Sequence, residues 1–286
     1  MNAVEFFRQS IPQLEPILYR HSVSMLERQN AESYDEPSSG TLVELAGHYL
    51  IMTAGHVIPS NPNGGNLWVL NRTPRNPFSE GVPEFLRFRR MQPYPDVGYL
   101  ELSEEVVETY LACEPCGIER LACRGAGREG RHVAFVGNPS EFARPITRSN
   151  ARGIIAVTKA FLSSPLSPAE FPTVSENDEP SSVDTDLFVP FNQQDISDIR
   201  TGEPIPMRSP HGYSGGGVWD LAFEPGQLWN PDDICVIGIQ SSYSEERRYM
   251  RGVQMQHWLR MIYDDYEDCR PVLEERFQKH FPRTAS

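Results

Sequence analysis

Residues 212–217 read Gly-Tyr-Ser-Gly-Gly-Gly, and this stretch decides the fold and function expected for the whole chain. Glycines on both sides of Ser214 allow a tight turn and leave open space beside its hydroxyl group. The backbone N–H groups of such a turn can converge on one point and stabilise an oxyanion. The six residues also fit a glycine-rich loop in which Ser214 has no chemical role. A base and a carboxylate elsewhere in the chain would favour the nucleophile.

The composition indicates a globular protein that does not bind nucleic acid. Of the 286 residues, 39% are hydrophobic and 23% are charged, which suits a fold with a sizeable core. The formal net charge is −13, whereas a surface for nucleic acid or anionic membranes needs clustered Lys and Arg. Residues 1–8 lack the pattern of a secretory signal, and no apolar run reaches the ~18 residues needed to span a bilayer. We therefore expect a cytoplasmic protein without nucleic-acid or membrane partners.

The five cysteines agree with a reducing compartment. Cys113, Cys116 and Cys123 form a C-x2-C-x6-C cluster, which could hold a metal ion if a fourth ligand came from elsewhere. No second CxxC and no His pair follows, so buried or free thiols are the favoured interpretation. No metal and no cofactor are predicted.

Many short extended segments at close spacing predict an all-β barrel or sandwich. The expected strands are at residues 18–27, 41–45, 49–52, 67–70, 85–88, 97–102, 132–136, 154–157, 187–189, 218–219 and 234–239. Helices are expected only near the ends: a short one at 2–10 that Pro12 ends, one leading out of 252–259, and one at 272–280.

Two residues could complete the chemistry of Ser214. His56 follows a predicted strand and the small residues Thr53-Ala54-Gly55, which leave room around an imidazole that acts as a general base. Asp96 precedes the predicted strand 97–102, where its carboxylate could accept the imidazole N–H and fix its tautomer. Each residue alone is commonly structural. Their occurrence together, in the order His56, Asp96, Ser214, favours a nucleophilic hydrolase.

These segments resemble the chymotrypsin/trypsin-like serine proteases. Residues 53–56 are similar to the TA-A/G-H motif of that family, 96–100 to its D-I-A-L-L segment, and 212–216 to its G-D-S-G-G motif. Residues 238–242 resemble its G-I-x-S segment, and 252–259 resemble its G-V-Y-T strand and terminal helix.

The resemblance covers roughly residues 18–263 and implies two six-stranded antiparallel β-barrels with the site in the cleft between them. The expected organisation is a helical extension (1–17), a first barrel with His56 and Asp96 (18–112), a connector (113–130), a second barrel with Ser214 and a Pro-, Ser- and acid-rich insertion at 163–186 (131–263), and a C-terminal helical tail (264–286).

The resemblance also implies a mechanism. Ser214 Oγ attacks a peptide carbonyl, and His56 takes its proton and later passes it to the leaving amine. Asp96 orients His56, and the backbone N–H groups of Gly212 and Ser214 form the oxyanion hole. Ser241 is placed where it can add a hydrogen bond to Asp96.

By the same analogy, four residues bind substrate: Arg208, Ser241, Ser242 and Tyr243. The base of the side-chain pocket lies near residues 207–209, with Ser242 and Tyr243 on its other wall. An inward-pointing Arg208 favours an acidic residue before the scissile bond. A solvated Arg208 at the surface is the plainer alternative.

Two departures from the family pattern bear on regulation. Tyr213 replaces the aspartate that pairs with a newly released N-terminus in secreted digestive members, so activation by N-terminal cleavage is not expected. Val57 stands where the family usually has a cysteine, and the disulfides of the family cannot be placed in this sequence. We therefore expect an intracellular, bacterial-type endopeptidase that acts on a protein or peptide substrate and is controlled by an activator or operon partner. The alternative is a catalytically silent module of the same fold that binds a partner.

Overall fold

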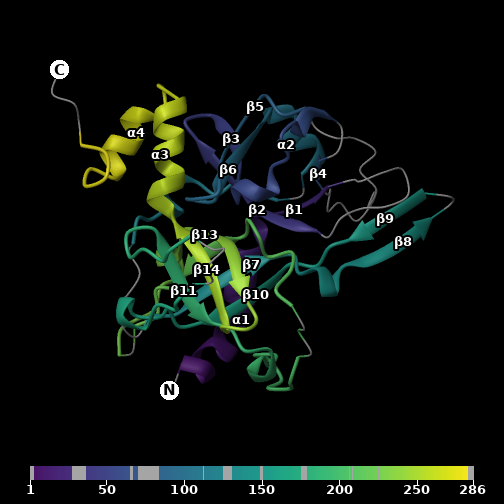
Figure 1. Cartoon of the computed structure of the whole chain (residues 1–286), viewed down its shortest axis with the longest axis vertical. Helices are drawn as coiled ribbons and strands as arrows, with labels where there is room; N and C mark the ends of the chain where they lie inside the picture. The colour runs from purple at the N-terminus through teal and green to yellow at the C-terminus, as the bar shows by residue number, and fades with distance from the viewer. Residues whose placement is uncertain are drawn as a thin grey trace.

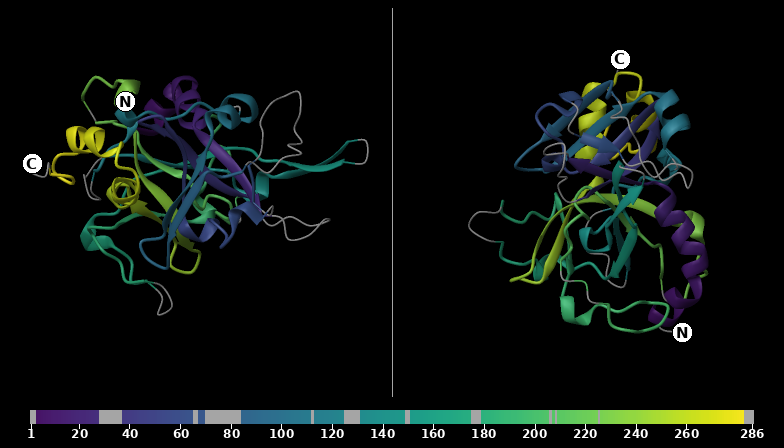
Figure 2. Two further views of the ribbon diagram at one scale, coloured as in Figure 1. Left: turned by 90° about the horizontal axis from the view of Figure 1, so that it is seen from above. Right: turned by 90° about the vertical axis from the view of Figure 1, so that its right-hand side faces the viewer.

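Two six-stranded antiparallel sheets form the body of the protein, one above the other in the right-hand view of Figure 2. The computed structural model describes residues 3–282 except 28–36, 65–66, 70–83, 112, 125–130, 149–150, 175–178, 206, 208 and 225. The first sheet contains β1 (Ser22–Glu27), β2 (Ser38–Leu45), β3 (His48–Thr53), β4 (Leu67–Val69), β5 (Arg87–Met91) and β6 (Val97–Leu102). The second contains β7 (Val133–Gly137), β10 (Lys159–Ser163), β11 (Asp186–Pro190), β12 (Gly217–Asp220), β13 (Cys235–Ser244) and β14 (Tyr249–Gln254). The predicted all-β fold with two six-stranded antiparallel sheets is confirmed.

The two sheets share one strand topology. Their orders are β4-β1-β2-β3-β6-β5 and β10-β7-β12-β13-β14-β11. When the strands of each sheet are numbered from one to six along the chain, both follow the circular order 1-2-3-6-5-4. The first sheet is open between its fourth and fifth strands, and the second between its second and third. The chain therefore builds the same antiparallel arrangement twice, and each copy contributes part of the site.

A third, two-stranded sheet was not predicted. It consists of β8 (Arg144–Arg148) and β9 (Ala151–Ile155), which pair antiparallel and project from the body in Figure 1 and in the left-hand view of Figure 2. The sequence predicts one strand at 154–157 and none at the positions of β8 or β10. β10 pairs along its whole length with β7, so the second sheet extends to the first residue of the expected 163–186 insertion.

The N-terminal helix is longer than predicted. α1 runs from Ala3 to Arg20, with Pro12 and Pro16 inside it, so the expected end at Pro12 and the expected strand from residue 18 are wrong. Both prolines are exposed, so the carbonyl groups that lose their helical N–H partner can bind water. The opposite face buries Leu14 and Leu18 in the main core. This packing outweighs the unfavourable intrinsic propensity of proline.

A second helix, just before the connector expected at 113–130, was not predicted. α2 spans Glu104–Tyr110, and the hydroxyl of Ser103 accepts the backbone N–H of Val106 at 3.3 Å. Ser before two glutamates is a normal helix start, because the side-chain oxygen and the negative charges satisfy the free N–H end. The remaining short 3₁₀ helices are η1 (Gly55–Val57), η2 (Pro62–Gly64), η3 (Ile118–Arg120), η4 (Ser140–Phe142), η5 (Pro168–Glu170), η6 (Gln193–Asp195) and η7 (Pro231–Asp233).

The C-terminal helices return the chain to the first sheet. α3 (Met255–Asp265) follows β14 of the second sheet directly, and α4 (Arg270–Arg276) comes after a short turn; Figure 1 shows α3 beside β3 and β6, with α4 on the other side of α3. Trp258 on α3 is fully buried and its indole N–H donates to the carbonyl of Gly98 on β6 at 3.1 Å. α3 therefore fastens the second sheet to the strand that follows Asp96. Among the described helices, none combines the length and apolarity needed to cross a membrane.

Candidate active site

His56 and Asp96 form a hydrogen-bonded pair at one end of the first sheet. His56 lies in η1 immediately after β3, and Asp96 immediately precedes β6. These strands are neighbours, with Thr53 opposite Gly98. Nδ1 of His56 lies 2.6 Å from Oδ2 of Asp96, and the backbone N–H of His56 donates to Oδ1 at 2.9 Å. Both carboxylate oxygens thus hold the histidine. The side chain of Asp96 is 16% exposed, and that of His56 is 46% exposed.

The chain has no room for a side chain beside this pair. A Cβ atom on Gly55 would lie 2.2 Å from the carbonyl oxygen of Met91 and 3.0 Å from Oδ1 of Asp96. Gly55 therefore allows η1 to approach the carboxylate closely. Nε2 of His56 has no hydrogen-bond partner among the described residues, which leaves it available to a substrate or nucleophile.

The turn that carries Ser214 packs against the end of β3. Gly215 has a φ of +86°, and a Cβ atom on it would lie 2.0 Å from Oγ1 of Thr53 and 3.1 Å from the backbone nitrogen of Ala54. The structure thus brings the turn to the segment that leads directly into His56, at the junction of the two sheets. Within the described part of the chain, no hydrogen bond joins Ser214 Oγ to His56. Such bonds are often long in unliganded enzymes.

The peptide bond between His211 and Gly212 is fixed in one orientation. The N–H of Tyr213 donates to the carbonyl of Pro210 at 3.1 Å, and Gly212 has a φ of +92°, as the third residue of a type II turn requires. The carbonyl of His211 accepts the N–H of Ser140 at 2.9 Å. In a trans peptide the N–H points opposite to the C=O. The N–H of Gly212 is therefore directed away from Ser140.

The two N–H groups predicted to form the oxyanion hole are both open. Among the described residues, neither the N–H of Gly212 nor that of Ser214 has a backbone or side-chain acceptor. The neighbouring N–H groups are occupied: that of Gly215 donates to Gln240 and that of Gly216 to Tyr213, each at 2.8 Å. Two unpaired donors two residues apart in a fixed turn suit the binding of a developing negative charge.

A buried serine of the first sheet holds this turn from behind, and the sequence analysis missed it. The N–H of Ser39 donates to the carbonyl of Ser214 at 2.9 Å, and its hydroxyl donates to the carbonyl of Gly212 at 2.5 Å. Its own carbonyl accepts the hydroxyl of Thr53 at 2.8 Å. Ser39 thus connects both residues of the predicted oxyanion hole to the strand before His56. The residues around Ser39 in the sequence carry no pattern that indicates this role.

Asn138 completes the support of Ser39. It is fully buried at the end of β7, and its backbone N–H donates to the hydroxyl of Ser39 at 2.8 Å. Its side-chain amide donates to the carbonyl of Val23 at 3.1 Å and accepts the hydroxyl of Thr158 at 2.9 Å. The Ser39 hydroxyl oxygen accepts the N–H of Asn138. Its own proton is therefore donated to the carbonyl of Gly212. The sequence shows Asn138 only as part of a Gly-Asn-Pro turn that ends a strand.

Tyr213 occupies the core of the second sheet. Its side chain is 1% exposed and packs with Phe135, Met207 and Val218. Burial raises the pKa of its phenol well above the usual value, and its hydroxyl has no partner among the described residues. The residue before the serine therefore anchors the turn by apolar packing.

Three of the four predicted substrate-binding residues lie in β13 and are described by the structure. Arg208 is outside the described residues. Ser241 is buried and donates its hydroxyl to the carbonyl of Arg251 at 3.3 Å, in place of the bond to Asp96 that the sequence analysis expected. The carbonyl of Ser242 accepts the side-chain amide of Gln240 at 3.0 Å. β13 is irregular between Gln240 and Ser242, so Ser241 is the extra residue of a bulge and has no partner in the register with β14.

Tyr243 connects the two walls of the predicted side-chain pocket. Its hydroxyl lies 2.6 Å from Nε2 of His211 and 3.1 Å from Oγ of Ser209. His211 was not predicted, although it directly precedes the glycine-rich stretch. The three side chains form a polar bridge beside the turn of Ser214.

A buried ion pair is bonded to Tyr94, two positions before Asp96 in the sequence. Arg251 donates to both carboxylate oxygens of the fully buried Asp186, each at 2.8 Å, and to the carbonyl of Glu179 at 3.0 Å. The hydroxyl of Tyr94 donates to the same carboxylate at 3.3 Å. The end of the acid-rich insertion is thus bonded to the residue two positions before Asp96.

The clustered cysteines provide no metal centre among the described residues. Within the described part of the chain, Cys113, Cys116 and Cys123 form no disulfide, and no fourth ligand is gathered with them. Burial raises the pKa of the Cys116 and Cys123 thiols to about 12, so both are protonated at neutral pH and poor nucleophiles.

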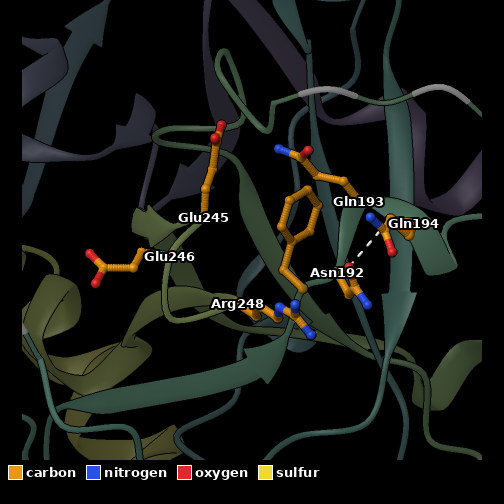
Figure 3. A pocket seen from close by; sticks show the side chains of 7 residues that line it. Asn192, Gln193, Gln194, Glu245, Glu246 and Arg248 are labelled. Atoms are coloured by element: carbon orange, nitrogen blue, oxygen red, sulfur yellow. Dashed lines mark hydrogen bonds between the residues drawn. The ribbon is translucent and has the colours of Figure 1, made fainter.

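A polar cavity of about 350 Å³ lies in the second half of the chain, beside the turn between β13 and β14. Figure 3 shows Asn192, Gln193, Gln194, Glu245, Glu246 and Arg248 around it. None of the three predicted catalytic residues lines this cavity, and its side chains carry charges of both signs.

A scan against models of protein families finds no match, and a sequence search of curated proteins finds none either. Among solved structures, the chain is similar to the serine endoprotease from Yersinia pestis, with a TM-score of 0.47 and 14% identity over 89% of this chain and 65% of that one. The chain thus spans less than two thirds of that protein's length. At this TM-score the similarity carries no argument about function, and the architecture rests on the chain's own strand order.

Proposed function

We propose that this protein is a trypsin-like serine endopeptidase in which Ser214 is the nucleophile, His56 the base and Asp96 the residue that orients it. The observation that carries the proposal is the double contact of Asp96 with His56, at 2.6 Å to Nδ1 and 2.9 Å to the backbone nitrogen. With Nδ1–H donated to the carboxylate, Nε2 is the free basic nitrogen of the neutral ring.

The reaction has two halves. Ser214 Oγ attacks the carbonyl carbon of a peptide bond while Nε2 of His56 takes the hydroxyl proton, and the same proton then goes to the leaving amine. Water, deprotonated by His56, releases the acyl group and restores Ser214. In each half the carbonyl oxygen becomes an oxyanion, which accepts the N–H groups of Gly212 and Ser214. Each such donor contributes roughly 3 to 4 kcal/mol to the transition state.

The substrate is a protein or peptide, and specificity belongs to the residues beside the turn. The bridge of Tyr243, His211 and Ser209 offers hydrogen-bonding groups to a polar side chain. Ser241 and Ser242 lie in β13 beyond the residues that pair with β12, which end at Ile239, so a substrate strand can add main-chain hydrogen bonds there. Arg208 stays the candidate that selects an acidic side chain.

Control by a partner protein in the bacterial cytoplasm is part of the proposal, and Tyr213 supports the expectation that N-terminal cleavage is not the control. This residue fills its place in the core with an aromatic ring, so the turn needs no ion pair with a released N-terminus. An activator protein or operon partner is then the simplest control of a protease whose turn is already formed.

A catalytically silent binding module is the second candidate. The observation that favours it is the missing hydrogen bond between Ser214 Oγ and His56 within the described residues. The two candidates differ in whether bonds are cleaved.

Cleavage of a peptide library, with products sequenced by mass spectrometry, tests the proposal. We expect cleavage by the native protein, none by Ser214→Ala, and undiminished cleavage by the control Ser244→Ala, whose hydroxyl only accepts the N–H of Arg247. A cleavage profile with no preference for Asp or Glu before the cleaved bond would show that Arg208 does not select an acidic side chain. No cleavage under any condition, with candidate activators present, supports the silent module.

A further inference from the structure

A second histidine and carboxylate cluster lies at the opposite end of β3 from His56. Nδ1 of His48 is 2.7 Å from Oε1 of Glu101, and Nε2 is 2.8 Å from Oδ2 of Asp268. Cys269, the next residue, is fully buried and its thiol lies 3.7 Å from the carbonyl of Leu45. The cluster therefore joins the start of β3, the end of β6 and the turn between α3 and α4. None of these residues takes part in the proposed protease site.

Three of these side chains present metal-binding atoms to one point. The ligand atoms of His48, Asp268 and Cys269 all lie within 4.8 Å of one another. In a tetrahedral zinc site with bonds of 2.0–2.3 Å, neighbouring ligand atoms are roughly 3.3–3.8 Å apart, so shifts of about 1 Å suffice. A thiolate, an imidazole and a carboxylate are a ligand set that Zn²⁺ prefers, whereas Mg²⁺ and Ca²⁺ prefer oxygen alone.

The surroundings match those of a metal-binding histidine. Such a histidine donates its second ring N–H to a carboxylate, which is itself held by another group. Glu101 has this position on Nδ1 of His48, and its other oxygen accepts the hydroxyl of Tyr266 at 2.8 Å. Glu101 is thus held on both oxygens and fixes the ring with Nε2 facing Asp268 and Cys269.

The site is open on one side. The side chain of Asp268 is 63% exposed and that of His48 is 23% exposed, whereas Cys269 is fully buried. An ion can therefore enter from solvent beside Asp268 and keep a water molecule as its fourth ligand.

We propose that Nε2 of His48, the carboxylate of Asp268 and Sγ of Cys269 bind a zinc ion that fastens the C-terminal helices to the first sheet. On binding, the thiol proton and any proton on Nε2 leave to solvent, and the ion replaces the direct hydrogen bond between His48 and Asp268. The ion links residues that are 220 positions apart in the chain. The site is structural, and it lies on the far end of β3 from His56.

Titration of the chelator-treated full-length protein with Co²⁺ tests this site, because a thiolate bound to cobalt gives a charge-transfer absorption band in the near ultraviolet. We expect one equivalent to produce the band and Zn²⁺ to abolish it by competition. Asp268→Asn, at an exposed position that tolerates the change, should weaken binding by at least tenfold. Glu101→Gln should weaken it roughly 10- to 100-fold, as expected for a residue that orients a ligand. Cys269→Ala should remove the band.

Cys123→Ala is the matched control, since Cys123 is a half-buried thiol of the other cysteine cluster and forms no disulfide among the described residues. This variant should keep the band and the affinity. Zn²⁺ should also raise the Tm of the native protein and leave that of Asp268→Asn nearly unchanged. No band in the native protein, a band that survives in Cys269→Ala, or a band that is lost in Cys123→Ala overturns the proposal. In the first case the cluster is only an ion-pair contact between the helices and the sheet.

Discussion

Each end of the β3–β6 strand pair carries a histidine bonded to a carboxylate, but the surroundings of the two pairs differ. At one end, His56 follows β3 and Asp96 precedes β6; at the other, His48 begins β3 and Glu101 lies in β6 opposite Leu50. Each histidine has Nδ1 within 2.7 Å of a carboxylate oxygen. The antiparallel register alone therefore produces two histidine–carboxylate pairs.

The second ring nitrogen distinguishes the two pairs. Nε2 of His48 is bonded to Asp268, and the ring is 23% exposed. Nε2 of His56 has no partner among the described residues, and its ring is 46% exposed beside the turn of Ser214. A base needs a free nitrogen that substrate can reach, whereas a doubly bonded histidine holds two parts of a fold together. The second ring nitrogen, and what lies beside it, therefore distinguishes the candidate base from the histidine that links two parts of the fold.

The largest expected effect comes from Asp96→Asn. The amide cannot hold His56 in the tautomer with a free basic Nε2, so kcat should fall by about 10⁴-fold. The free energy of unfolding should change far less, because the site is open to solvent on the histidine side. Steady-state kinetics and urea unfolding of the same preparation measure both. Equal kcat for Asp96→Asn and the native protein would show that the two histidine pairs are not functionally different.

Removal of the buried ion pair next to Asp96 should have the largest effect on stability. Arg251→Met leaves the fully buried Asp186 without its charged partner, and should lower the free energy of unfolding by about 3 to 5 kcal/mol. The control is Arg260→Ala, which breaks an exposed pair with Asp264 on α3 and should cost about 0.5 kcal/mol or less. Urea unfolding gives both values, and similar losses for the two variants would contradict this assignment.

Glu101→Gln should mainly lower the free energy of unfolding, whereas Asp96→Asn should mainly lower kcat. The substitution weakens charged hydrogen bonds to His48 and Tyr266, so we expect a loss of about 1 to 3 kcal/mol in the metal-free protein. Chemical denaturation in the presence of a chelator measures it. If the loss of unfolding free energy is as small as that of an exposed ion pair, Glu101 does not stabilise the contact between the first sheet and the C-terminal helices.

The smallest of these effects is expected for Ser39→Ala. Without the hydroxyl, the carbonyl of Gly212 and the N–H of Asn138 lose their partner, and the oxyanion donors are less well fixed. We expect kcat to fall about tenfold, which corresponds to ~1.4 kcal/mol, with KM nearly unchanged. Ser38→Ala is the matched control, since that hydroxyl makes only a 3.5 Å contact with the carbonyl of Met25. A rise in KM at constant kcat would place the role of Ser39 in substrate binding instead.

The elements that the sequence predicts are those with local signals. The alternating and continuous apolar runs predict β3, β6 and β13, and the short motifs around His56 and Ser214 identify both residues. Pro12 misleads because the helix it interrupts is held by tertiary packing of Leu14 and Leu18, which no local rule includes.

The supporting contacts of the site have no local signal at all. Ser39 and Gly212 are 173 positions apart, and Arg251 and Asp186 are 65 apart. Single polar residues inside strands, such as Ser39, are ordinary in a sequence and acquire their role only from the register of the two sheets. The same holds for His48, whose partners lie 53 and 220 positions away.

Modification by a fluorophosphonate, followed by intact mass and peptide mapping, tests the central claim most directly. The account predicts one adduct per chain, on Ser214, formed much more slowly in Asp96→Asn and absent in Ser214→Ala. An adduct on another residue, or an equal rate of modification in Asp96→Asn, would contradict the claim that His56 and Asp96 activate Ser214.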